Sequence, residues 1–141
     1  MNGSPVVILL LILLLLLVLL LSIPADAQQG PACGQNAVVN AQGAATVKLV
    51  ADPSGNARVY VCGWNLNAGA AASAFQFQGG TGAACAGGNA IVSGTYNLAI
   101  NGSNTDTSAI ARGMATAPGA GLCMVVTGAG PLNGNVYYSQ Q

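Results

Sequence analysis

Side chains able to do acid–base or nucleophilic chemistry are scarce in this chain. It holds three acidic side chains and no histidine. Beyond the N-terminal segment the acidic residues are Asp52 and Asp106, and both lie in sequences typical of turns. Glycosidase chemistry needs two carboxyl groups held across one bond, and a serine nucleophile needs a base such as histidine. We therefore interpret both aspartates as turn residues and expect a protein that is not an enzyme, with no catalytic residue and no cofactor.

The sequence contains few residues that could bind a metal ion. Asp106 lies near Asn101 and Asn104, and calcium accepts carboxylate and amide oxygens of this kind. A single carboxylate makes a weak calcium site. Zinc is a poor candidate as well, because histidine is absent and no cysteine pair has C-x-x-C spacing. We therefore expect no metal site.

The four cysteines are Cys33, Cys62, Cys85 and Cys123. Their spacing does not match the redox motif of thioredoxin-like proteins. Four cysteines in a short exported chain predict two disulfides, for which three pairings exist. We favour Cys33–Cys62 and Cys85–Cys123, because the first would tie a loose N-terminal segment and the second a glycine-rich loop onto a predicted strand.

The N-terminal segment predicts the export that stable disulfides require. Val6–Leu21 is an uninterrupted apolar run, and the small-residue triplet Ala25-Asp26-Ala27 follows it after a proline. This order is typical of a secretory signal peptide in residues 1–27 that is cleaved after the triplet. The alternative is an uncleaved anchor, in which residues 6–21 would be the membrane contact. In either case we expect residues 28–141 to lie in the periplasm, on the cell surface or in the medium.

The composition argues against nucleic acid as a partner and favours association with further copies of the chain. Charged residues make up 4% of the chain and the net charge is zero, whereas roughly 25% is usual. The dispersed cations Lys48, Arg58 and Arg112 cannot form a basic patch, so we expect no nucleic acid partner. An uncharged surface of amides, hydroxyls and glycine repels further copies weakly. The composition therefore predicts a homo-oligomer or a larger assembly.

The secondary structure predicted after the signal segment consists of β-strands. The region after the signal segment has no helical periodicity, but it has short apolar or alternating runs separated by turn residues. The predicted strands are Ala37–Asn40, Ala45–Ala51, Ala57–Leu66, Ala72–Gln78, Ala90–Ile100, Ser108–Arg112, Gly121–Thr127 and Asn135–Ser139. About eight short strands at this spacing predict one all-β domain over residues 28–141, an antiparallel β-sandwich or jelly roll, preceded by the N-terminal hydrophobic signal helix.

Turn residues predict how the strands connect. The segment 52–56, Asp-Pro-Ser-Gly-Asn, predicts a hairpin. Asn101-Gly102 and Asn133-Gly134 predict tight turns. The glycine-rich segments 79–82 and 128–131 predict loops. Residues 68–74 are rich in alanine but carry no helical apolar stripe, so we expect a loop that leads into a strand.

Two aromatic residues of the third predicted strand are candidates for a ligand platform. The two-residue period of a strand places Tyr60, Cys62, Trp64 and Leu66 on one face, and the neighbouring valines on the other. Aromatic faces can cover sugar rings while asparagine and glutamine amides bond the hydroxyls. A surface glycan is therefore a candidate ligand for Tyr60 and Trp64, and Tyr96, Tyr137 and Tyr138 are further aromatic residues of the kind that such a platform uses. The alternative is that Tyr60 and Trp64 fill the core beside Cys62 and that Tyr137 and Tyr138 occupy the two faces of the last strand.

Four segments that contain glycine and cysteine form a pattern found in other proteins. The segments are Ala57–Trp64, Gly80–Cys85, Gly121–Cys123 and Gly134–Gln140. This pattern resembles small β-rich proteins of tailed phages and prophages, a largely uncharacterised group. The resemblance implies a virion or surface structural protein and assigns no functional residues.

Two functions are consistent with these observations. The first is a non-catalytic, exported structural or surface protein that assembles with itself in a phage or prophage context. The second is a secreted binding module for a glycan or another ligand on a host surface. They differ in whether an aromatic side chain is exposed for a ligand.

Overall fold

The computed structural model describes residues 13, 32–108 and 113–141. The predicted signal peptide and its cleavage site lie outside the described residues, apart from Leu13. The chain divides into two units, Met1–Gly30 and Pro31–Gln141, and the strands belong to the second. In the part of the chain that the structure describes, no helix is long and apolar enough to span a membrane.

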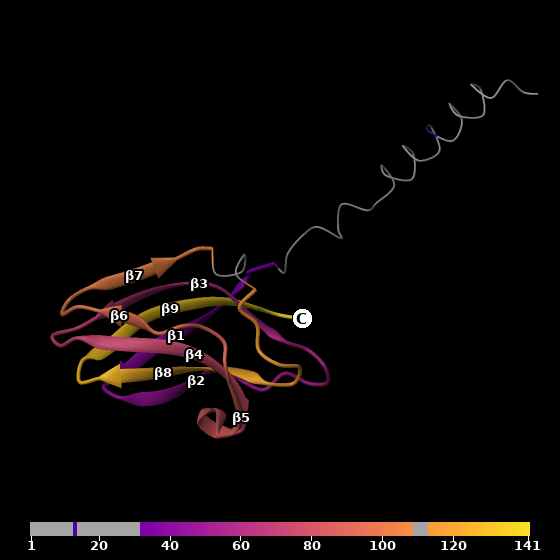
Figure 1. Cartoon of the computed structure of the whole chain (residues 1–141), viewed down its shortest axis with the longest axis horizontal. Coiled ribbons are helices and arrows are strands. Elements are labelled where there is room, and N and C mark those ends of the chain that lie inside the picture. The colour runs from indigo at the N-terminus through magenta and orange to yellow at the C-terminus, as the bar shows by residue number, and fades with distance from the viewer. Residues whose placement is uncertain (1–12, 14–31, 109–112) are drawn as a thin grey trace, which may run out of the picture. The chain divides into compact units, whose positions relative to one another are not determined.

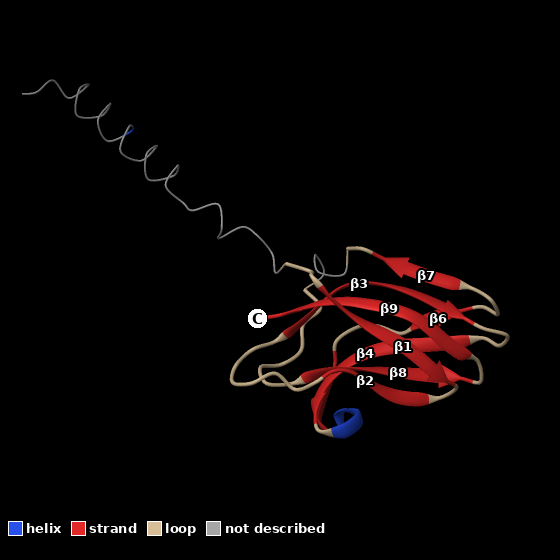
Figure 2. Ribbon diagram, turned by 180° about the vertical axis from the view of Figure 1, so that it is seen from behind, coloured by secondary structure: helices blue, strands red, loops and turns tan. Residues whose placement is uncertain are grey.

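Strands dominate the second unit and form two antiparallel sheets (Figures 1 and 2). Sheet A has the order β1 (Gln35–Gln42), β9 (Pro131–Gln140), β3 (Val59–Ala68) and β7 (Ser103–Asp106). Sheet B has the order β2 (Ala45–Val50), β8 (Gly121–Gly128), β4 (Ser73–Thr81) and β5 (Gly87–Ile91), and β6 (Tyr96–Leu98) also pairs with β4. A single helical turn, η2 (Ala83–Cys85), lies between β4 and β5. The predicted all-β class with antiparallel sheets is confirmed.

The core lies between the two sheets, as in a β-sandwich. It is built from aromatic and aliphatic side chains of both sheets. The largest fully buried ones are Trp64, Leu66, Leu132, Phe75, Phe77, Leu122 and Met124. On β4 the alternation is regular, because Phe75 and Phe77 are buried while Gln76 and Gln78 are half-exposed on the opposite face.

The predicted faces of β3 are wrong, and a β-bulge is the reason. Val61 pairs with Tyr138 and Gly63 with Tyr137, so Cys62 is an extra residue in the strand. One extra residue reverses the alternation beyond it. Val59 and Val61 therefore face the core together with Trp64, although their sequence positions place them on opposite faces.

Two predicted strands differ from the observed ones. The strand predicted over residues 90–100 is divided into β5 and β6, because the Ser93 hydroxyl accepts the Phe77 backbone N–H (2.9 Å) where a ladder carbonyl would otherwise lie. β7 ends at Asp106, two residues before the start of the strand predicted over 108–112. Asp106 ends β7 by accepting the backbone N–H of Ser108 (2.7 Å), as aspartates in turns do. Residues 109–112 lie outside the described residues.

Several predicted turns are also corrected. Residues 52–56 form no hairpin, since they join β2 of sheet B to β3 of sheet A. Gly134 lies within β9, where a Cβ would come within 2.0 Å of the Asn65 carbonyl oxygen. Gly80 lies within β4, where a Cβ would be 2.8 Å from that of Cys85. At both positions glycine permits a close approach within a strand, and it does not mark a loop.

Other connections follow the prediction. Asn101 has a positive φ of 55°, and the Gly102 N–H bonds the Ala99 carbonyl (2.9 Å), which makes the turn between β6 and β7. Residues 69–72 connect β3 to β4 as a loop, and residues 129 and 130 connect β8 to β9.

Candidate functional site

The carboxylate of Asp52 joins three segments of the chain. It pairs with Lys48 of β2 and accepts backbone N–H groups from Gly82 (2.8 Å) and Gly121 (3.1 Å). Lys48 also donates to the carbonyls of Gly80 (3.3 Å) and Gly82 (3.0 Å). The hydrogen bond from Lys48 and those from the two glycine N–H groups lower the pKa of Asp52. These contacts engage both carboxylate oxygens in holding the loop after β4 and the start of β8.

The second aspartate, Asp106, is engaged by its own neighbours. Its carboxylate accepts from both the backbone N–H (2.7 Å) and the hydroxyl (3.0 Å) of Ser108. Asp106 thus has the contacts of a residue that holds a turn. Asp52 does not, because its partners Gly82 and Gly121 are distant in sequence. Among the described residues, no group of three or more histidine, cysteine, aspartate or glutamate side chains could hold a metal ion.

Both predicted disulfides are confirmed, Cys33–Cys62 and Cys85–Cys123. Cys85 and Cys123 are fully buried and fasten η2 against sheet B. Cys62 is buried in the bulge of β3, while Cys33 is exposed. Two disulfides indicate an oxidising compartment, and hence an exported domain.

Trp64 is a core residue in the structure, as the alternative to the ligand platform predicted for it. Its exposed fraction is 0%. Its ring lies 5.2 Å from that of Phe77 and 4.8 Å from that of Tyr96, and its Nε1 donates to Asn104 Oδ1 (2.6 Å). Tyr60 is half-buried and lies outside the core cluster, since the bulge separates the faces of the two residues. They cannot form one platform.

The exposed aromatic residue is Tyr137 of β9. Its exposed fraction is 42%, whereas its neighbour Tyr138 packs partly against the core. A shallow pocket of about 220 Å³ lies beside it and is lined by Cys33, Cys62, Gly63 and Thr107 as well. The alternation of β9, with Val136 buried, is the sequence signal that could have identified Tyr137.

Two rows of residues, polar except for Val38, cross sheet A next to Tyr137. The strand registers give these rows as Val38–Asn135–Asn65–Thr105 and Asn40–Asn133–Asn67–Ser103. We call the outward-facing set the amide face; it consists of Asn36, Val38, Asn40, Asn65, Asn67, Ser103, Thr105, Asn133, Asn135 and Tyr137. All are exposed except the half-buried Asn135. None carries a charge.

Hydrogen bonds along the amide face hold some of its side chains in place. Asn36 Nδ2 donates to Asn135 Oδ1 (3.3 Å), and Thr105 Oγ1 donates to Asn65 Oδ1 (3.3 Å). An asparagine side chain offers two N–H donors and a carbonyl with two lone pairs. Each of these bonds therefore leaves most of that capacity for another partner.

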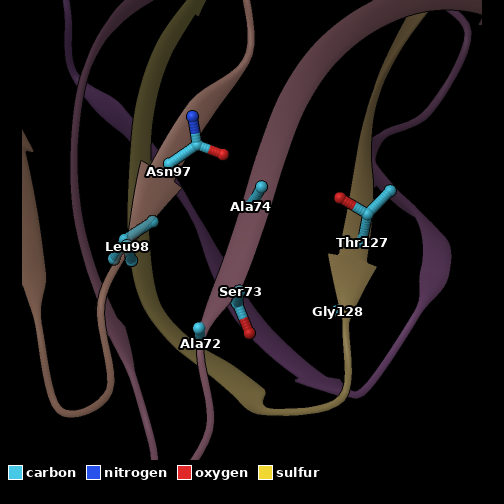
Figure 3. Close-up of a pocket in the computed structure, with 7 residues that line it drawn as sticks. All are labelled: Ala72, Ser73, Ala74, Asn97, Leu98, Thr127 and Gly128. Atoms are coloured by element: carbon cyan, nitrogen blue, oxygen red, sulfur yellow. The ribbon is translucent and has the colours of Figure 1, made fainter.

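A second pocket lies on sheet B and has fewer functional groups. It measures about 260 Å³, and Figure 3 shows Ala74 between the amide of Asn97 and the hydroxyl of Thr127. The Ser73 hydroxyl beneath it is already used, because it donates to the Gly130 carbonyl (3.0 Å). The lining contains no aromatic and no charged residue. The amide face, with Tyr137, is the richer surface.

The edge of sheet A at β1 is the second candidate feature. β1 has 8 residues, carries no charge and no proline, and pairs with β9 without a register shift. Its outward Val38 is 74% exposed. The other edges of the described sheets are less regular: β2 carries Lys48 and a bulge, β7 has 4 residues, and β5 and β6 are two short pieces. Such interruptions normally protect an edge from pairing with another chain, and β1 lacks them.

Comparison with protein-family models, with curated proteins and with solved structures found no match to this chain.

Proposed function

We propose that this protein is a non-catalytic, exported structural protein whose copies assemble by pairing their β1 strands. The observation that carries the proposal is the regular, uncharged edge of β1 with Val38 exposed on it. An unpaired strand edge presents N–H and C=O groups that another strand can satisfy. A surface with almost no charge offers little repulsion to a second copy.

An antiparallel pair of β1 strands around a two-fold axis gives a definite contact. If the axis passes through Val38, the side chain meets Val38 of the second copy, and Asn36 lies opposite Asn40 of that copy. Residues directly opposite in an antiparallel pair point to the same face, so the two amide faces would form one continuous surface. The exposed valines would be buried against each other.

The setting of this assembly is part of the proposal. The two disulfides support an exported location. The resemblance to β-rich proteins of phages and prophages leads us to propose a virion or a cell surface as the place of assembly. The hydrogen bonds of both aspartates favour a structural over a catalytic role: Asp52 joins distant segments of the chain, and Asp106 holds its own turn.

The assembly is tested by sedimentation velocity over a range of protein concentrations. Val38→Lys places a charge on the edge and should lower the association constant at least about tenfold. The matched variant Val38→Thr keeps a β-branched, uncharged side chain and should associate nearly as wild type. A wild-type protein that stays monomeric at millimolar concentration, or a Val38→Lys variant that associates as tightly as wild type, would contradict the proposal.

The location is tested by mass spectrometry of fractions from the native source. A tryptic peptide from Gln28 to Lys48 arises only if the segment before Gln28 has been cleaved off. We expect this peptide in sedimenting particles or at the cell surface. Its presence only in the soluble medium would contradict the structural role, and intact leader peptides in membranes would show a tethered domain.

A further inference from the structure

We infer that the amide face of sheet A binds a neutral polysaccharide, with Tyr137 as the residue on which a sugar ring stacks. This goes beyond the proposed assembly, because it assigns a ligand to a surface that β1 pairing leaves open. The candidate surface is defined by contacts and registers within sheet A.

Tyr137 provides the apolar part of the site. A tyrosine ring combines a flat apolar face with a polar hydroxyl, which suits a ligand that is amphipathic in the same way. The pocket beside it, about 220 Å³, is smaller than the 300–1,000 Å³ of pockets that enclose a whole small-molecule ligand. It therefore fits one ring of a chain that runs over the surface.

The asparagine rows provide the polar part. Asn65 and Asn67 lie on β3, with Asn135 and Asn133 opposite them on β9, so four amides form a block next to Tyr137. Side chains on one face repeat about every 6.7 Å along a strand, and strands lie about 4.8 Å apart. Amides at this density can donate to and accept from successive hydroxyl groups of an extended glycan.

The charge distribution selects a neutral ligand. The amide face contains no cation, and the described cations are engaged away from it. Lys48 pairs with Asp52 and bonds the loop after β4, and Arg58 donates to the Thr116 carbonyl (3.5 Å). An acidic glycan would therefore lose the hydration of its charges without gaining an ion pair on this surface, whereas a neutral glycan has no charge to desolvate.

Binding is tested with the protein produced from the full-length chain, on an array of neutral and acidic glycans and on suspensions of chitin, cellulose and mannan. We expect retention on at least one neutral polysaccharide. Tyr137→Ala should weaken it about tenfold or more, while Tyr137→Phe, which keeps the ring, should stay within about threefold of wild type. Binding should change little between about 0.05 and 0.5 M NaCl, because no ion pair contributes.

Matched amide variants separate this site from the rest of the surface. Asn65→Ala combined with Asn67→Ala should also weaken retention, whereas Asn97→Ala removes an exposed amide from sheet B and should have no effect. Circular dichroism and thermal unfolding would show that each variant is folded. The inference is overturned if wild type binds no neutral polysaccharide, if it binds acidic glycans only, or if Tyr137→Ala binds as wild type does.

Discussion

At the residue scale, Trp64 links the two sheets through its ring. It belongs to β3 of sheet A and contacts Phe75, Phe77 and Tyr96 of sheet B. Aromatic pairs in such edge or tilted arrangements add roughly 0.5–1.5 kcal/mol each beyond the burial of their area. The indole N–H is satisfied by Asn104, so the largest side chain of the core leaves no unpaired polar group.

The burial of Trp64 predicts its fluorescence. It is the only tryptophan in the chain. We expect acrylamide to quench the native emission weakly and the emission of the urea-unfolded protein strongly, because the folded core excludes the quencher. Strong quenching of the native protein would show that the ring is exposed, and it would restore Trp64 as a candidate ligand platform.

Asp52 predicts how stability depends on pH. Its pKa in the folded protein is lowered, chiefly by the hydrogen bond from Lys48. Its contribution to stability is therefore fully present above the unfolded value of about 3.9, and it is lost as the pH falls through the lower folded pKa. In urea titrations from neutral to acidic pH, wild type should lose more stability below about pH 4 than Asp52→Asn does. Parallel pH profiles for the two proteins would contradict this role.

At the element scale, the close approach of β9 to β3 depends on glycine. Gly134 has a φ of 144°, and a Cβ there would lie 2.0 Å from the Asn65 carbonyl oxygen. Gly134→Ala should lower the free energy of unfolding by about 2–4 kcal/mol. The control is Gly34→Ala, where a Cβ would meet nothing within 4 Å and the change should stay within about 0.5 kcal/mol. Chemical denaturation compares them, and equal stabilities would contradict the close approach.

The two disulfides should differ in accessibility. They span sequence separations of 29 and 38 residues, so the chain-entropy model assigns each about 4 kcal/mol. Limiting reductant should open Cys33–Cys62 first, because Cys33 is exposed, whereas Cys85 and Cys123 are buried. Mass spectrometry after alkylation under native conditions measures the order. Reduction of Cys85–Cys123 first would contradict the burial of that pair.

Replacing each cysteine pair by serine should show a second difference. Removal of Cys85 and Cys123 leaves two hydroxyls in a buried position, which adds a desolvation cost to the lost cross-link. We therefore expect the Cys85→Ser/Cys123→Ser protein to be less stable in urea than the Cys33→Ser/Cys62→Ser protein. The opposite ranking would mean that the N-terminal cross-link matters more than the packing of η2.

At the scale of the whole molecule, the near absence of charge sets how copies meet. The described part of β1 and the amide face carry no charge, so association through them should be nearly insensitive to salt. Sedimentation velocity at about 0.05 and 0.5 M NaCl should give association constants within about threefold of each other. A steep fall with salt would indicate ion pairs at the contact and would argue against pairing through β1.

The sequence predicted much of the fold because many of its signals are local. Alternation and turn residues predicted strands near β3, β4 and β8, and cysteine number with export predicted two disulfides that the structure contains. The features that the sequence predicted wrongly depend on contacts with segments that are distant in sequence. The glycines of β4 and β9 looked like loop residues, since their close neighbours, Cys85 and Asn65, are distant in sequence.

For the candidate site too, some features follow from the sequence alone and others only from the pairing of distant strands. The sequence by itself determined the composition of the surface: the chain is rich in asparagine, has few aromatic residues, and only 4% of its residues are charged. Only the tertiary structure decided that Trp64 is buried, that Tyr137 is exposed, and that asparagines from three strands lie in register. The physical reason is that one bulge at Cys62 reverses the faces of β3, and cross-strand register arises only when distant segments pair.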